Sequence, residues 1–332
     1  CRDRLLSEGV ALDQYNSAAS AADVNDLRIA LGYEQMNLLG VSYGSRLALT
    51  IMRDHPAGIR SVLLDSAYPP QVNLYTELAP NADRAFEALF AGCAEDPDCN
   101  SRYPNLRGDF YDLADRLNAN RTMVSVWDAS AGVNRSVRLD GDILIDVLFV
   151  GLYNPFVIAT MPQMIAQVRD NDYSIMQERL QLYYGSGGAR GMQMSVQCRE
   201  EIPFETAQDA LDQAADVPEQ IAGFFPLNYP TLLGVCEDWP AGPLDPLEAQ
   251  PVRSDIPTLI LAGRYDPITP PEWGQLAAET LPNSTYLRFS NAGHWVLRAG
   301  PCGVNIAAAF FNNPSAPLDS SCVAGVGSPN WR

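Results

Sequence analysis

The sequence predicts an α/β fold in which a parallel sheet is split by a long helical insertion. An apolar run of strand length at 36–42 is followed by a helical stretch at 45–54 and a second buried strand at 59–65. Strand–helix–strand alternation of this kind is typical of parallel sheets. The same pattern returns over 257–313, whereas residues 71–253 show mainly helical spacing.

Residues 1–70 are expected to form the first part of the sheet domain. A helix is predicted over 17–32, because serines can cap its start and Gly32 can end it. Pro56 and Gly58 stop the helix that follows the first strand.

Residues 71–253 are predicted to be a helical segment with Pro- and Gly-rich breaks. We expect a flexible loop at 185–191 and a linker at 239–251. The amphipathic stretches are 81–92, 108–118, 141–150, 158–170, 172–184 and 206–216.

Residues 254–332 return to the sheet pattern and complete the domain. Strands are predicted at 257–264 and 284–291, and helices within 270–282 and at 305–313.

The composition excludes several classes of function. The chain of 332 residues carries a net charge of −18, and all 22 basic residues are arginine. Without lysine, the chain cannot form a lysine Schiff base or a Walker P-loop. The negative charge argues against a nucleic-acid partner and suits a cationic ligand such as a free amino group. No apolar run is long enough to predict a membrane span.

Seven cysteines suggest an oxidising compartment, because neighbouring cysteines can close three local disulfides. The alternative is a set of buried free thiols. Cys1 is left over, which suggests a partner upstream. There is no signal peptide and no initiator methionine, so we expect a processed chain or a fragment. The suggested pairs are Cys93–Cys99, Cys198–Cys236 and Cys302–Cys322.

A G-x-S-x-G motif at Gly40–Gly44 supplies the candidate nucleophile, Ser42. The motif lies between a predicted strand and a predicted helix, as a nucleophile elbow requires. The serine would sit on a strained turn too tight for side chains at the two glycines. The alternative is a small-residue turn with a solvated serine.

A serine hydroxyl needs a base, and the chain has only two histidines. His294 follows a predicted strand, whereas His55 ends the helix that leads away from Ser42. His294 is therefore the predicted base, and His55 is interpreted as structural.

The base needs a carboxylate that fixes its tautomer. Asp266 follows the strand at 257–264 and comes one βα unit before His294, so it is the predicted acid. Asp65, also just past a strand, is the alternative and is interpreted as a turn carboxylate.

The oxyanion would accept a hydrogen bond from the backbone N–H of Tyr43, the residue after the nucleophile. A second donor normally comes from an earlier loop, and nothing upstream of Ser42 here can supply it. We expect the N-terminal strands of the sheet to be absent from this chain.

These motifs resemble the tripeptidyl aminopeptidase and proline iminopeptidase group of α/β-hydrolases over nearly the whole chain. The elbow alone is unspecific, but the ordered set of cysteine-bearing motifs is specific. The matching segments are Asn37–Leu49, Met52–Pro56, Leu64–Pro70, Cys198–Glu201, Cys236–Pro240 and Asp266–Pro271, with Cys302 and Cys322.

The resemblance implies a secreted serine exopeptidase that releases short peptides from a free N-terminus. It implies that Ser42, Asp266 and His294 form the triad and that 71–253 is a helical cap. The family's early Gly-Gly-Pro-Gly loop is absent, and a cysteine in that missing part would be the partner of Cys1. No cofactor or metal is implied.

Cap carboxylates in such enzymes bind the substrate's ammonium group, and Glu200 and Glu201 are the candidates here. The alternative is a solvated acidic pair. Two other functions stay open. One is a carboxylesterase or lipase-like hydrolase with the same triad, and the other is an inactive fragment or subunit.

Overall fold

The computed structural model describes residues 1–128, 132–184, 188–225 and 229–332. The main sheet is parallel, and its strand order is β1-β2-β5-β6. The insertion therefore begins after β2 and ends before β5, which are neighbours in the sheet. Its strands are β1 (Met36–Ser42), β2 (Ile59–Ala67), β5 (Thr258–Gly263) and β6 (Ser284–Phe289).

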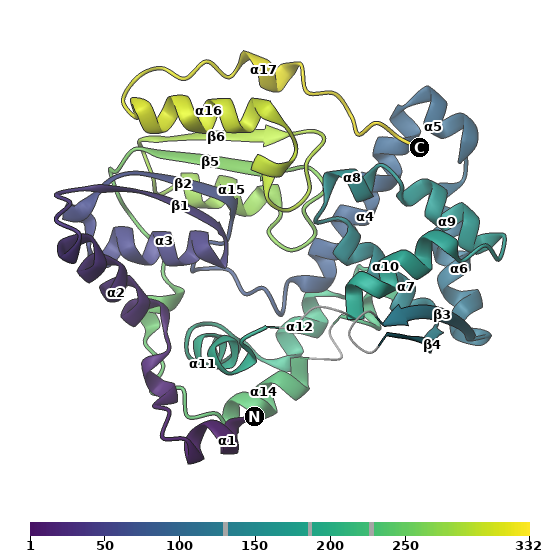
Figure 1. Ribbon diagram of the computed structural model, residues 1–332, viewed down its shortest axis with the longest axis horizontal. Coiled ribbons are helices and arrows are strands. Elements are labelled where there is room, and N and C mark those ends of the chain that lie inside the picture. Colours follow the sequence, from purple (N-terminus) through teal and green to yellow (C-terminus); the bar gives the residue numbers. More distant parts are fainter. Residues whose placement is uncertain (129–131, 185–187, 226–228) are drawn as a thin grey trace.

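Helices cover both faces of this sheet, with α16 on one side and α3 and α15 on the other (Figure 1). Neighbouring residues of β2 point to opposite faces, as expected in a strand. Leu63 packs in the core beneath α16, and Val62 and Leu64 pack in the core beneath α3. The helices outside the insertion are α1 (Arg2–Ser7), α2 (Ser17–Ala30), α3 (Tyr43–Asp54), α15 (Pro271–Ala278), α16 (Pro301–Asn312) and α17 (Ser321–Ala324).

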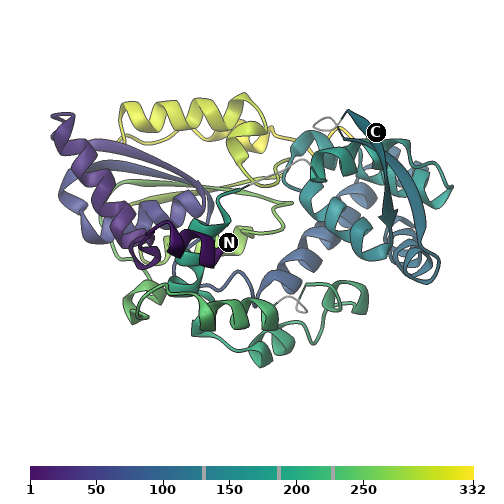
Figure 2. The same ribbon diagram turned by 60° about the horizontal axis from the view of Figure 1, so that its bottom comes forward.

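The residues between β2 and β5 form helices and one hairpin that lie beside the sheet in both views (Figures 1 and 2). Many of these helices share an apolar core that includes Phe86 and Phe110. The helices are α4 (Leu78–Glu95), α5 (Pro97–Arg102), α6 (Leu106–Ala119), α7 (Gly141–Gly151), α8 (Pro155–Ile158), α9 (Met161–Arg169), α10 (Ser174–Tyr184), α11 (Arg190–Glu200), α12 (Ala207–Gln213), α13 (Glu219–Ala222) and α14 (Tyr229–Asp238). In the described residues the 3₁₀ helices are η1 (Leu12–Gln14), η2 (Pro56–Gly58), η3 (Ile202–Phe204), η5 (Pro246–Ala249) and η6 (Val296–Arg298).

The sequence analysis missed the antiparallel hairpin of β3 (Thr122–Asp128) and β4 (Val133–Leu139). The signal was present, because Val124 and Val126 are buried and alternate with exposed Met123. Of the predicted loop at 185–191, residues 185–187 lie outside the described part of the chain. Helix α11 already begins at Arg190, which the analysis also missed.

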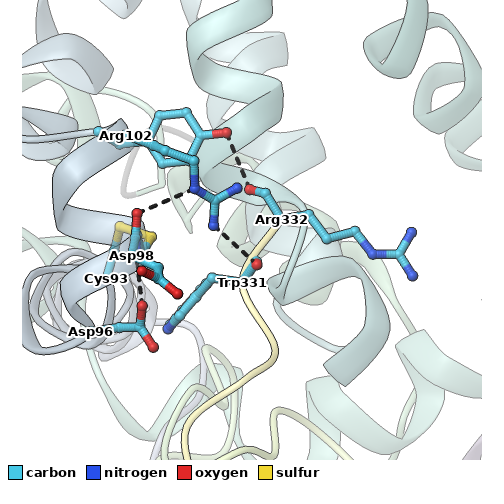
Figure 3. Close-up of a disulfide and its surroundings, with 8 residues drawn as sticks. Cys93, Asp96, Asp98, Arg102, Trp331 and Arg332 are labelled. Atoms are coloured by element: carbon cyan, nitrogen blue, oxygen red, sulfur yellow. Dashed lines mark hydrogen bonds between the residues drawn. A yellow bond between two sulfur atoms is a disulfide. The ribbon is translucent and has the colours of Figure 1, made fainter.

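The three predicted disulfides are present, and Cys1 is exposed and free. The pair Cys93–Cys99 joins α4 to α5 next to the last residues of the chain (Figure 3). Arg102 Nη2 donates to the carbonyl oxygen of Trp331 at 3.1 Å. The segment that follows α17 is therefore fastened to the helices of the insertion. None of the described helices is both long and apolar enough to cross a membrane.

Candidate active site

Ser42 lies at the carboxyl end of β1, immediately before α3, with φ 58° and ψ −127°. A positive φ is strained for any residue with a side chain. A Cβ atom at Gly40 would lie 2.3 Å from the carbonyl oxygen of Gly44, so this turn admits no side chain at Gly40. The expectation for Gly44 is wrong, because a Cβ there meets no described atom within 4 Å.

Asp266 and His294 are in direct contact at the ends of β5 and β6. Asp266 Oδ2 lies 2.9 Å from His294 Nδ1, and Asp266 is fully buried. The backbone N–H groups of Ile268 and Thr269 donate to Asp266 Oδ1 at 3.1 and 2.9 Å. This contact suits a neutral histidine that carries its proton on Nδ1 and leaves Nε2 as the base.

Thr269 is a site residue that the sequence analysis missed. Its Oγ1 lies 2.8 Å from Asp266 Oδ2 and 3.1 Å from His294 Nδ1. The signal was its position three residues after an aspartate, where hydroxyls commonly close a carboxylate turn.

Asp266 and His294 shift each other's pKa in opposite directions. Burial opposes the charge of Asp266, but the charge and hydrogen bond of His294, together with the hydrogen bonds from Thr269, lower the pKa of Asp266. Burial likewise opposes the imidazolium, but the charge and hydrogen bond of Asp266, with a contribution from Asp65, raise the pKa of His294. The imidazolium that forms during proton transfer is thus favoured here.

Neither Asp65 nor His55 takes the place of Asp266 or His294 in this contact. Both Asp65 oxygens accept backbone N–H groups, from Val296 and Leu297. His55 is the half-buried residue that ends α3, at the opposite end of that helix from Ser42.

Among the described residues, the candidate nucleophile Ser42 is not hydrogen-bonded to Asp266 or His294. Within the described part of the chain, Ser42 Oγ makes no hydrogen bond, to His294 or to any other residue. Catalytic hydrogen bonds are often long in free enzymes and shorten when substrate binds.

A cavity of about 360 Å³ opens beside Ser42. Its other walls bring together residues that are far apart in the sequence, from α3, from the segment that follows β2, and from α11. The lining residues are Ser42, Tyr43, Arg46, Tyr68, Leu74, Ala189, Met192, Gln193, Val196, Gln197, Glu200 and Glu201.

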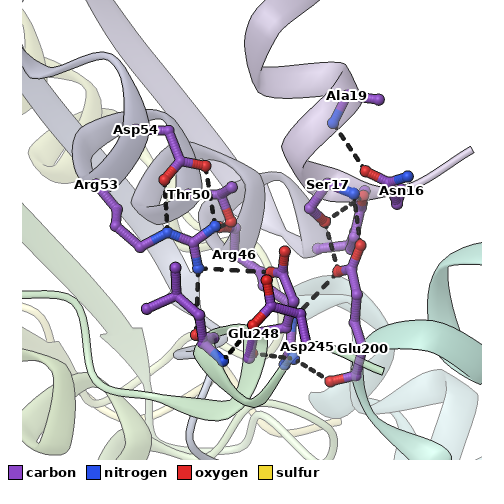
Figure 4. Close-up of polar contacts among 12 residues, drawn as sticks. Asn16, Ser17, Ala19, Arg46, Thr50, Arg53, Asp54, Glu200, Asp245 and Glu248 are labelled. Atoms are coloured by element: carbon purple, nitrogen blue, oxygen red, sulfur yellow. Dashed lines mark hydrogen bonds and ion pairs between the residues drawn. The ribbon is translucent and has the colours of Figure 1, made fainter. Parts of the chain in front are cut away.

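Glu200 is buried and joins the insertion to the sheet domain (Figure 4). Its two oxygens accept the backbone N–H and the hydroxyl of Ser17 at 2.5 and 2.6 Å. Arg46 Nε lies 3.9 Å from Glu200 Oε2. Because Ser17 is the first residue of α2, the carboxylate also faces the positive end of that helix.

Glu201 is equally buried, but only one of its oxygens is engaged. Oε1 accepts the Tyr68 hydroxyl and, at 2.6 Å, the backbone N–H of Leu74. From the described residues, Oε2 accepts no hydrogen bond. Glu201 therefore keeps one oxygen for another donor.

The cavity has more acidic than basic groups around it. Arg46 is its buried cation, and the carboxylates of Glu200, Glu201 and Glu248 all act on it. Burial raises the pKa of Glu200 and of Glu201, and the guanidinium only partly counters this. A second cation in the cavity would stabilise both carboxylates.

Comparisons with known proteins agree with the fold. A family model described as alpha/beta hydrolase fold matches residues 3–133, and one described as TAP-like protein matches residues 227–322. The serine protease Hip1 of Mycobacterium tuberculosis H37Rv and that of Mycobacterium bovis are each 24% identical to this chain over 326 residues. The match covers 91% of this chain and 60% of the length of these relatives.

Solved structures show a more distant likeness. The alpha/beta hydrolase MGS-M2, from a Medee basin deep-sea metagenome library, is 15% identical with a TM-score of 0.41. That match covers 92% of this chain and 75% of the other. A thermophilic esterase from Thermogutta terrifontis is 15% identical with a TM-score of 0.37, over 91% and 74% of the two chains.

The chain has the α/β-hydrolase fold. Its later part is similar to TAP-like proteins, and most of its length is similar to the serine protease Hip1.

Proposed function

We propose that this protein is a serine exopeptidase that hydrolyses peptides from a free N-terminus. The observation that carries the proposal is the shared cavity, which places Ser42 and two buried carboxylates on the walls of one space. With a nucleophile and an amine-binding group in one cavity, the bond that is cleaved would lie at a fixed distance from the substrate's N-terminus.

In the proposed reaction, Ser42 Oγ attacks the scissile carbonyl carbon while its proton passes to Nε2 of His294. The Tyr43 N–H donates to the oxyanion. Collapse of this intermediate breaks the C–N bond, and the leaving amine takes the proton from His294. Water then attacks the acyl-enzyme with His294 again as base, and the N-terminal fragment leaves.

We assign the substrate's ammonium to Glu201 rather than to both carboxylates. Glu201 lines the cavity and has one oxygen that accepts no hydrogen bond from the described residues, whereas both oxygens of Glu200 accept from Ser17. The cation would restore the ionised form that burial disfavours in Glu201. Glu200 then positions the site by tying α11 to α2.

The proposal also covers the setting of the enzyme. Three disulfides are consistent with an extracellular protein and support secretion. The exposed Cys1 could form a disulfide with an N-terminal segment of the same precursor.

Matched peptide p-nitroanilides test the proposal, one with a free N-terminus and one acetylated, with Ser42→Ala as control. We expect cleavage of the free form only, abolished by the substitution. Equal cleavage of both would favour an esterase-like or endo-acting hydrolase. If neither peptide is cleaved, the chain is better explained as a fragment that needs a partner segment. The missing hydrogen bond between Ser42 and His294 would agree with that explanation.

A further inference from the structure

The residues directly after His294 are held by the end of a different strand. Three successive N–H groups donate to two successive side chains of β2. Trp295 N donates to Ser66 Oγ at 2.8 Å, Val296 N to Asp65 Oδ1 at 2.7 Å, and Leu297 N to Asp65 Oδ2 at 3.0 Å.

This arrangement depends on two unusual backbone conformations. Ser66 has φ 59° and Trp295 has φ 71°, both in the left-handed region that residues with side chains seldom adopt. Both Asp65 and Ser66 are fully buried, so water does not compete for these donors. Strain that is held in place by several hydrogen bonds is typical of functional sites.

The histidine loop is also packed from the other side. A Cβ atom at Gly293 would collide with the carbonyl oxygen of Leu152, and the Tyr153 ring lies 4.8 Å from the imidazole between centroids. His294 thus has its Nδ1 fixed by Asp266 and its backbone fixed by β2.

We propose that Asp65 and Ser66 are positioning residues for the base, which hold the His294 segment through its backbone while the Asp65 charge acts on the imidazole. This inference rests on the proposed function, because it assumes that His294 is the base. It gives the Asp266–His294 contact a second support that is independent of Asp266.

A role only in folding would lead to different behaviour. Burial raises the pKa of Asp65 to about 6, despite the hydrogen bonds from Leu297 and Val296. An ionised Asp65 therefore costs stability at neutral pH, so a role in folding alone predicts that Asp65→Asn leaves the pH profile of activity unmoved. The charged or titratable groups that act on His294 are Asp266 and Asp65, and the neutral Tyr153 ring packs on it.

The test is the pH profile of kcat and of kcat/KM for Asp65→Asn and Ser66→Ala, with Asp255→Asn, an exposed aspartate, as matched control. For Asp65→Asn we expect kcat to fall about a hundredfold, the effect of a displacement of about 1 Å. The acid limb should move to lower pH, because one negative charge near the imidazolium is lost. Ser66→Ala should lower kcat by about tenfold, with the limb unmoved and KM little changed.

The outcomes separate this inference from the proposed function. If Ser42→Ala keeps activity, the proposed function fails and the inference fails with it. If Ser42→Ala is inactive but Asp65→Asn keeps the native profile, only the inference is overturned. Should Asp65→Asn not fold, Ser66→Ala decides alone, and an unchanged kcat in that variant overturns the proposal.

Discussion

The two halves of the candidate site differ in how completely the chain itself organises them. On the acid–base side, Asp266 accepts from two backbone groups and Thr269, and its Oδ2 contacts His294. On the nucleophile side, Ser42 Oγ has no hydrogen-bond partner among the described residues, and the Glu201 Oε2 beside the same cavity also lacks one.

This difference indicates which interactions precede substrate and which would come with it. The acid–base side is fixed before binding, which lowers the reorganisation needed during proton transfer. The nucleophile side keeps unengaged polar atoms around a cavity of about 360 Å³, where a substrate can supply their partners. The variants below are ordered by expected effect.

Asp266→Asn should break the preorganised side most severely. An amide at this position favours the wrong histidine tautomer, and we expect kcat to fall by about 10⁴-fold with the fold retained. Asp65→Asn is the variant for comparison, and its loss of kcat should be smaller. Steady-state kinetics and a circular dichroism spectrum check both. Full activity in Asp266→Asn with complete loss in Asp65→Asn would exchange the roles of the two acids.

The pH dependence should show the raised pKa of His294 directly. The base must be neutral, so kcat/KM should rise with pH through the pKa of His294. Since Asp266 and Asp65 raise that pKa, the acid limb should lie above the ordinary value of 6.5. Below it, activity should fall by about tenfold per pH unit. A limb below 6.5 would contradict the electrostatic description of this pair.

Thr269→Val removes the hydroxyl that touches both Asp266 and His294 without changing the side-chain shape. We expect kcat to fall by about tenfold, the loss of one hydrogen bond to a charged group. Thr280→Val is the matched control, because the Thr280 hydroxyl bonds to the carbonyl of Val252 instead. Equal kcat values in the two variants would remove Thr269 from the site.

Glu200→Gln should affect stability more than selectivity. It weakens the contacts with Ser17 and Arg46, and we expect about 2 kcal/mol of lost stability in denaturant unfolding. Glu237→Gln, on exposed α14 surface, is the control and should change little. If Glu200→Gln is as stable as the control but loses the preference for free N-termini, the amine site belongs to Glu200.

The sheet domain was largely predictable from the sequence. The strand predicted at 36–42 has the same bounds as β1, because a short apolar run between a helix end and a Gly-containing turn has few alternatives. The hairpin β3–β4 and helix α11 were missed because both lie in the long insertion, where helical spacing dominates and a Gly-rich run precedes α11.

The site divides in the same way. Ser42 and His294 could be named because one motif and two histidines left few candidates. The different roles of Glu200 and Glu201 could not, because they depend on tertiary partners. Ser17, which holds Glu200, is 183 residues away in sequence.

The most direct test of the central claim is the selectivity of Glu201→Gln. The quantity is the ratio of kcat/KM for a free peptide p-nitroanilide to that for its acetylated form, in this variant and in the native protein. We predict a strong native preference for the free amine, which falls by about a hundredfold in Glu201→Gln, mainly through KM, because a buried charge-assisted contact is lost. An unchanged ratio would contradict the claim that this cavity recognises the substrate's amino end through Glu201.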